Sequence, residues 1–253
     1  PQLLTGQALF VDDVQLPEML HAAFVRSTYA HARIVNIDVS KALQREGVVA
    51  VYTAADLGDY WRPGPLLVPP PPIDNIVFNQ RTQVPLAKEK VRFVGEPLAM
   101  VLAESRYIAE DALQDVHVDY DPLSVVVDLT TALDGDSALV HDDLNTNLCA
   151  HVVQTKGNYV EAKKKAACVL KREFVYDHGA AAAMENRGIV ASWDRRARRL
   201  TVWDTTQAPI PIRNGLAEML QLSENQIRVI APFIGGGFGP KIMMFYQEEV
   251  LIP

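Results

Sequence analysis

Short apolar runs separated by polar stretches fill the first half of the chain, in a pattern that predicts strands mixed with short helices. The runs with strand composition are residues 21–27, 33–40, the start of 47–57, and 91–105 with breaks at Gly95 and Pro97. Ser105 is placed to cap a helix over 106–116, on which Ile108 and Ala112 recur four residues apart. A proline-rich stretch over 63–72 can neither pair inside a sheet nor continue a helix, so we expect a surface loop there.

The second half of the chain follows a polar, turn-rich stretch over 129–150, which is the best candidate for a linker between domains. The elements expected beyond it are a helix over 159–167, strands over 169–177, 189–194 and 200–206, a helix over 209–222 and a strand over 225–232. In the second of these helices Ile212, Leu216 and Met219 lie at helical spacing. The last strand leads directly into the glycine-rich stretch IGGGFGPK over 234–241.

Composition limits the kinds of partner that the chain can have. Its 253 residues suffice for one large domain or two ordinary ones, and 49% hydrophobic with 22% charged residues is typical of a soluble globular protein. Acidic residues outnumber basic ones by 31 to 24 and no extended Lys/Arg run occurs, so we expect no nucleic-acid partner. The basic clusters at 163–165 and 195–199 are expected to be a solvated helix face and an exposed turn. No apolar run is long enough to span a bilayer.

Cys149 and Cys168 are the only cysteines, which leaves room for one disulfide but not for a disulfide framework. This content fits a reducing compartment, and we expect a cytoplasmic location. Two thiols fall short of the ligands that an iron–sulfur cluster normally takes, and none of the six histidines has a partner at metal-ligand spacing. The chain starts without methionine and ends inside an apolar segment at Pro253, so we expect a fragment, a processed chain or one piece of a split subunit.

The glycine-rich stretch has a plain interpretation and a functional one. Glycines after a strand commonly form a tight turn, because glycine tolerates positive φ. A dinucleotide fingerprint fails here because Pro240 stands where the third glycine belongs, and a P-loop fails because Pro240 separates Gly239 from Lys241 and Ile242 follows. The remaining functional interpretation is a loop whose missing side chains let a large cofactor touch the backbone, with Phe238 beside it.

Four stretches together resemble the molybdenum-binding subunit of the xanthine dehydrogenase / aldehyde oxidase / carbon monoxide dehydrogenase family. They are LLTGQALFVDDVQLPEMLHAAFVRSTYAHARI, VRFVGEPLAMVLAESRYIAEDA, AMENRGIVASWD with LTVWDTTQAPI, and IRVIAPFIGGGFGPK. Their order along nearly the whole chain matches the N-terminal part of that subunit. The resemblance implies an α+β fold, with an α/β hammerhead domain over 1–128, a linker over 129–150 and the first part of a molybdopterin-binding domain over 151–253.

The resemblance also implies roles for individual residues. Gln207 matches the family's glutamine whose amide lies near the oxygen ligands of molybdenum, whereas the residues alone favour a surface turn before Pro209. The stretch Gly236, Gly237, Phe238 and Gly239 matches the loop around the metal end of the pyranopterin. The implied cofactor is a molybdenum-pyranopterin in its cytosine dinucleotide form. No catalytic residue and no protein ligand to the metal is assigned, since the family's catalytic glutamate is not among these residues.

The implied function is that of a component of a molybdenum hydroxylase, which oxidises a small molecule with water as the oxygen source. Ile242 stands where purine-oxidising members carry a glutamate, which favours an aldehyde or an N-heterocyclic aromatic substrate. The implied partners are a second polypeptide that completes the molybdenum subunit, an iron–sulfur subunit with 2Fe-2S clusters and a subunit with FAD. Two alternatives stay open: a non-catalytic scaffold or maturation subunit, and a generic nucleotide-binding domain. Glu185 is interpreted as the structural partner of Arg187 rather than as a catalytic carboxylate.

Overall fold

The computed structural model describes residues 1–66, 76–176, 179–242 and 247–253. Its strands are β1 (His21–Arg26), β2 (Ala32–Asp38), β3 (Val48–Thr53), β4 (Val77–Phe78), β5 (Lys90–Val91), β6 (Pro97–Ala103), β7 (His117–Pro122), β8 (Ala150–His151), β9 (Ile189–Asp194), β10 (Arg199–Asp204) and β11 (Ile227–Ile230). Its α-helices are α1 (Ser40–Leu43), α2 (Arg106–Ala112), α3 (Tyr159–Lys165), α4 (Pro209–Leu220) and α5 (Gln247–Leu251). Short 3-10 helices are η1 (Val11–Asp13), η2 (Ala54–Tyr60), η3 (Leu113–Asp115), η4 (Asp142–Leu144) and η5 (Glu224–Gln226).

Strand β6 is the centre of the first half of the chain. It pairs antiparallel with both β1 and β3, and all its residues except Leu102 are buried. Successive side chains of a strand point to opposite faces. On one face Ala99 and Val101 pack against helices α1 and α2, and on the other Leu98 packs against the second sheet, β5-β2-β7. Helix α2 begins where the sequence predicts, because the Ser105 hydroxyl accepts a hydrogen bond from the Ile108 N–H.

The third sheet, β11-β10-β9, positions the glycine-rich stretch. Strands β9 and β10 form an antiparallel hairpin, whereas β10 and β11 run parallel. The crossover between the parallel strands is α4, whose Ile212 and Leu216 are fully buried against Leu200 and Val202 of β10. Because parallel strands end at the same edge of a sheet, the segments that follow β10 and β11 lie side by side.

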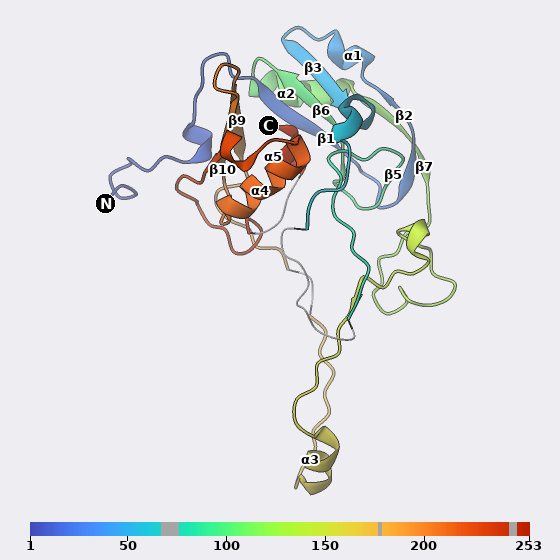
Figure 1. Cartoon of the computed structure of the whole chain (residues 1–253). Coiled ribbons are helices and arrows are strands. Elements are labelled where there is room, and N and C mark those ends of the chain that lie inside the picture. The colour runs from blue at the N-terminus through green and yellow to red at the C-terminus, as the bar shows by residue number, and fades with distance from the viewer. Residues whose placement is uncertain (67–75, 177–178, 243–246) are drawn as a thin grey trace.

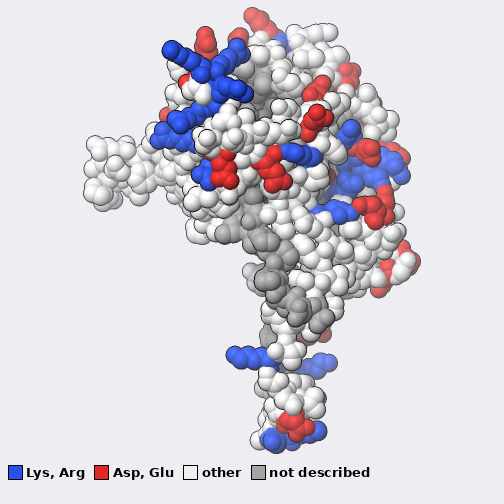
Figure 2. Space-filling view, viewed as in Figure 1, with Lys and Arg blue, Asp and Glu red and all other residues white. Residues whose placement is uncertain are grey.

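Residues 195–198 of the basic cluster form the exposed turn between β9 and β10, as expected, and Arg199 begins β10. The Asp194 carboxylate accepts hydrogen bonds from the N–H groups of Arg196 and Ala197, which fixes the turn. Figure 2 shows basic side chains gathered over this end of the hairpin. No helix among the described residues is long and apolar enough to cross a membrane.

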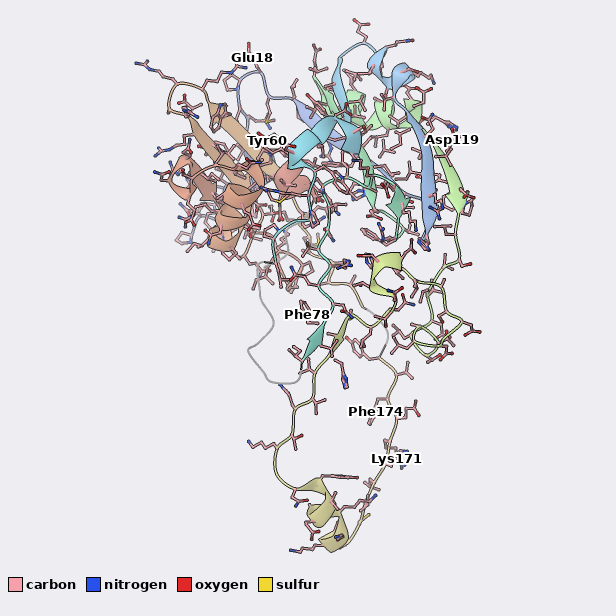
Figure 3. All side chains as sticks on the ribbon, turned by 45° about the vertical axis from the view of Figure 1, so that its right-hand side comes forward. Glu18, Tyr60, Phe78, Asp119, Lys171 and Phe174 are labelled. Carbon is pink, nitrogen blue, oxygen red and sulfur yellow. The ribbon has the colours of Figure 1, made fainter. Side chains whose placement is uncertain are left out.

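One predicted strand is wrong. Residues 169–176 form no strand, and none of them makes a backbone-to-backbone hydrogen bond with another described residue. Figure 1 shows α3 at the tip of an arm that projects from the body, and Figure 3 shows Lys171 and Phe174 on one leg of that arm. The β-forming side chains of 169–176 are present, but no neighbouring strand within the described ranges supplies the ladder that a strand needs.

Two predicted segments lie partly outside the described residues, and the predicted linker is described in full. The proline-rich loop over 63–72 is described only to residue 66, and Asp177 of the predicted strand lies outside the described part. The stretch over 129–150 is turn-rich as expected, and the Asn147 side chain makes several of the hydrogen bonds within it. Asn147 accepts a hydrogen bond from the Val140 N–H at 3.0 Å and donates to the carbonyls of Ala132 and Ala138 at 2.9 and 2.8 Å.

Candidate functional site

The candidate site lies where the segments that follow β10 and β11 meet. Gln207 comes three residues after the end of β10, and the glycine-rich stretch follows β11. The Gln207 N–H donates a hydrogen bond to the carbonyl of Lys241 at 2.7 Å. Its side-chain Oε1 accepts a hydrogen bond from the Gly239 N–H at 3.3 Å. The structure therefore brings together Gln207 and the loop residues 236–239, which were predicted as one site.

Gly237 has no space for a side chain because Gln207 lies against it. A Cβ on Gly237 would lie 2.2 Å from Oε1 and 2.4 Å from Cδ of Gln207. A Cβ on Gly236 would lie 2.8 Å from the Phe238 ring and 3.2 Å from the Ala183 Cβ. A side chain on Gly237 would therefore displace the Gln207 amide from the loop, whereas Gly236 is explained by its positive φ as well as by these contacts.

Phe238 adopts a backbone conformation that is unfavourable for a bulky residue. Its φ is +48°, between Gly236 at +102° and Gly239 at +97°. For an L-residue the left-handed region costs about 1–2 kcal/mol. The Phe238 side chain is 73% exposed, so little packing offsets this cost. Such outliers cluster at functional sites.

The loop also presents free backbone donors. Within the described part of the chain, the N–H groups of Gly236, Gly237 and Phe238 have no hydrogen-bond partner. Consecutive N–H groups in a glycine-rich turn form a concavity that binds anionic or strongly polar atoms. The combination of free N–H groups, absent side chains and the Gln207 amide suits a large polar ligand that contacts the backbone.

Glu185 is a structural residue, but its predicted partner is wrong. The Glu185 carboxylate forms an ion pair with Lys241, at 3.0 Å between Oε2 and Nζ, and accepts a hydrogen bond from the Gly235 N–H at 2.7 Å. Arg187 instead pairs with Glu248 of α5. Glu185 lies directly beside Gly235, at the start of the loop that ends at Lys241. The sequence signal for this pair was a lysine immediately after the glycine stretch.

Asp204 is a buried acid that the sequence did not single out. It ends β10 and is 3% exposed. Burial raises the pKa of its carboxyl from 3.8 to about 7, while Arg187 lowers it and Glu248 raises it by weaker charge interactions. Its Oδ2 has no hydrogen-bond partner among the described residues. The only signal was an aspartate at the end of an apolar run.

Metal-ligating side chains do not gather anywhere in the described ranges. These ranges contain no group of three or more His, Cys, Asp and Glu side chains that could hold a metal ion. Cys149 and Cys168 are both exposed free thiols, so they do not form the disulfide that the composition allowed.

Two family models match the chain. The aldehyde oxidase and xanthine dehydrogenase a/b hammerhead domain matches residues 5–124. The molybdopterin cofactor-binding domain matches residues 140–253 and therefore includes Gln207 and the whole glycine loop.

Similar whole proteins belong to the same group. The large chain of carbon monoxide dehydrogenase from Afipia carboxidovorans is 40% identical over 94% of this chain, and the large subunit of nicotine 6-hydroxylase from Paenarthrobacter nicotinovorans is 35% identical over 100% of it. Quinoline 2-oxidoreductase from Pseudomonas putida 86 has a similar structure, with a TM-score of 0.87 and 35% identity over 99% of this chain. The chain spans 30% of the length of the first two relatives and 31% of the third.

Proposed function

This chain belongs to the family of molybdenum-binding large subunits of xanthine dehydrogenases, aldehyde oxidases and carbon monoxide dehydrogenases, and we propose that its glycine loop and Gln207 hold the metal end of a molybdenum-pyranopterin. The fold is a hammerhead domain followed by part of a molybdopterin-binding domain. We place the hammerhead domain at 1–128, the linker at 129–150 and the start of the second domain at 151–253. We also propose the cytosine dinucleotide form of the cofactor.

The observation that carries this proposal is the absence of side-chain space between Gln207 and the loop. A ligand that enters here meets backbone N–H groups directly, with the Gln207 amide on one side and the exposed Phe238 ring beside it. When bound, the cofactor supplies two-electron oxidation of a substrate with water as the oxygen source. The N–H groups of Gly236, Gly237 and Phe238 orient it by donating hydrogen bonds to its polar atoms. The Gln207 side-chain N–H₂ remains free to donate, because Oε1 already accepts from Gly239.

The substrate that we propose is an aldehyde or an N-heterocyclic aromatic molecule. Ile242 is 38% exposed directly after the loop and offers no hydrogen bond to a purine. Relatives named for nicotine and quinoline, both N-heterocycles, support this class. We further propose that a second polypeptide completes the subunit, that electrons pass to 2Fe-2S and FAD subunits, and that the assembly is cytoplasmic.

The test is the molybdenum content of the complex purified through this chain from its native source, measured by inductively coupled plasma mass spectrometry. Molybdenum equimolar with the chain, accompanied by iron, is the expected result. A folded complex without molybdenum, from cells supplied with the metal, would overturn the proposal. It would favour a scaffold or maturation subunit that kept the fold and lost the cofactor.

A further inference from the structure

Lys241 closes the glycine loop, and its side chain is buried although it carries a charge. Only 2% of the side chain is exposed. Its ammonium group lies 3.0 Å from the Oε2 of Glu185 and donates a hydrogen bond at 2.9 Å to the Glu185 backbone carbonyl. Replacing a buried ion pair by apolar side chains is often neutral or stabilising. A gain in stability therefore does not by itself explain this ion pair.

Glu185 holds the opposite end of the same loop. Its Oε2 accepts a hydrogen bond from the Gly235 N–H at 2.7 Å, and its own N–H donates to the Gly235 carbonyl at 3.2 Å. The two residues are so close that a Cβ on Gly235 would lie 2.6 Å from the Glu185 Cβ. One carboxylate oxygen thus joins the residue that opens the loop to the residue that closes it.

The backbone of Lys241 also holds the segment that carries Gln207. Its carbonyl accepts hydrogen bonds from the Gln207 N–H at 2.7 Å and from the Thr206 hydroxyl at 3.4 Å. The position of Lys241 therefore sets the distance between Gln207 and the loop. A loop with this many glycines has large conformational freedom and no side chains with which to pack itself, so contacts from outside must impose its shape.

We propose that Glu185 and Lys241 are positioning residues, whose ion pair holds the N–H groups of residues 236–238 and the Gln207 amide in the arrangement that receives the cofactor. This inference rests on the proposed function for the identity of the ligand. The effect on loop order stands on the contacts alone and can be measured without the metal.

The experiment compares variants of the complete complex by hydrogen exchange of the 235–242 amides, by thermal unfolding, and by molybdenum and pterin per chain. In Lys241→Met, which keeps the length of the side chain, we expect loop amides to exchange about tenfold faster or more. Cofactor content should fall several-fold. Because Lys241→Met removes the ion-pair partner of the partly buried Glu185 carboxylate, thermal stability should fall as well.

The double variant Glu185→Gln with Lys241→Met separates positioning from stability. It removes both charges, so thermal stability should recover toward that of the wild type. The loop should still exchange fast and retain little cofactor, because neither side chain then joins Gly235 to residue 241. Lys241→Arg, which keeps the charge, should retain more cofactor than Lys241→Met.

Asp115→Asn is the matched control. The Asp115 side chain is 6% exposed and pairs with Lys41 and Arg45 in the hammerhead domain. Loss of the Asp115 carboxylate should leave two quantities unchanged. These are hydrogen exchange of the 235–242 amides and cofactor content per folded chain. The inference is overturned if the double variant recovers loop order and cofactor together with stability, or if Lys241→Met leaves loop exchange as in the wild type. A wild-type complex without molybdenum would refute the proposed function, while the exchange data would still decide the role of the ion pair.

Discussion

Gln207 occupies the space that a side chain at Gly237 would need. The Oε1 of Gln207 lies 2.2 Å from the ideal position of a Cβ on Gly237, and its Cγ lies 2.8 Å from it. Contact with Gln207, rather than a positive φ, explains why a glycine stands at position 237. It also offers a way to move the Gln207 amide without changing Gln207 itself.

Gly237→Ala should displace the Gln207 amide at little cost to the fold. The atoms that clash are the far end of a flexible, exposed side chain, which can rotate away. We expect the free energy of unfolding to change by less than about 1 kcal/mol. Molybdenum per purified complex should fall several-fold. Denaturant unfolding and metal analysis of the same preparation check both parts.

The control for Gly237→Ala is Gly135→Ala. A Cβ on Gly135 meets nothing within 4 Å, and Gly135 does not have a positive φ. This variant should match the wild type in stability and in molybdenum content. Equal molybdenum in both variants would contradict a role for the Gln207 amide in holding the cofactor.

Phe238→Gly should separate the stability of the loop from its function. Glycine relieves the unfavourable φ of +48° but adds chain entropy to the unfolded state, so the two effects largely cancel. We expect the free energy of unfolding to stay within about 1 kcal/mol of the wild type. Cofactor retention should fall because the ring that lies over Gly236 is lost. Thermal unfolding and pterin fluorescence measure the two quantities.

Arg198→Gly provides the same relief of backbone strain outside the site. Arg198 has a φ of +50° in the exposed turn between β9 and β10. It should show a similarly small change in stability and no change in cofactor. If Phe238→Gly retains as much cofactor as Arg198→Gly, Phe238 is not part of the cofactor site.

Most of the fold follows from local sequence signals. The strands at β1, β2, β3, β9, β10 and β11 lie within a few residues of the predicted ranges, because each combines β-forming side chains with a flanking turn. Helix α2 starts after Ser105 for the predicted reason, and α4 starts at Pro209. The error at 169–176 has a non-local cause: a strand needs a neighbour, and side-chain composition does not show whether one exists.

The candidate site was predictable in part. The resemblance to the family, rather than the residues alone, identified Gln207 and the glycine loop as one site. In the structure the parallel pair β10 and β11 brings the two segments to one edge of the sheet. The partner of Glu185 was not predictable, since Arg187 is near in sequence whereas Lys241 is near in space. Asp204 was missed because its unusual pKa comes from burial, which depends on the packed structure.

Asp204 should make the protein less stable as the pH rises from about 4 to 7. Its pKa is about 7 in the folded state against 3.8 ordinarily, so over this range the unfolded chain ionises while the folded carboxyl keeps its proton. The stabilisation is complete below the lower value and is lost through the upper one. The loss is on the order of 4 kcal/mol, from roughly three pKa units.

Asp204→Asn tests whether the Asp204 carboxyl keeps its proton in the folded protein. The variant should be more stable than the wild type at pH 8 and equal to it near pH 4, in denaturant unfolding at both values. Asp59→Asn, at an exposed aspartate on η2, should differ from the wild type by the same amount at both pH values. A constant difference between Asp204→Asn and the wild type across the range would refute a buried, protonated Asp204.

The arm segment 169–176 should become a strand when the polypeptide that we propose as the completing partner binds. Phe174, Val175 and Tyr176 are 88%, 89% and 92% exposed, and the backbone around them lacks ladder partners among the described residues. An extended segment with free N–H groups and apolar side chains pairs readily with the edge of another sheet. Hydrogen exchange at 169–176 should therefore be fast in this chain alone and at least about a hundredfold slower in the assembled complex.

Phe174→Asp and Lys171→Ala distinguish specific pairing from general exposure, because both residues lie on the same leg of the arm (Figure 3). An aspartate at 174 places a charge in the apolar contact and should weaken co-purification of the partner polypeptide more than tenfold. Alanine at 171 removes an exposed lysine and should leave co-purification unchanged. Equal effects of the two changes, or equal exchange at 169–176 before and after assembly, would mean that this segment does not pair with the partner and that the subunit is completed through another surface.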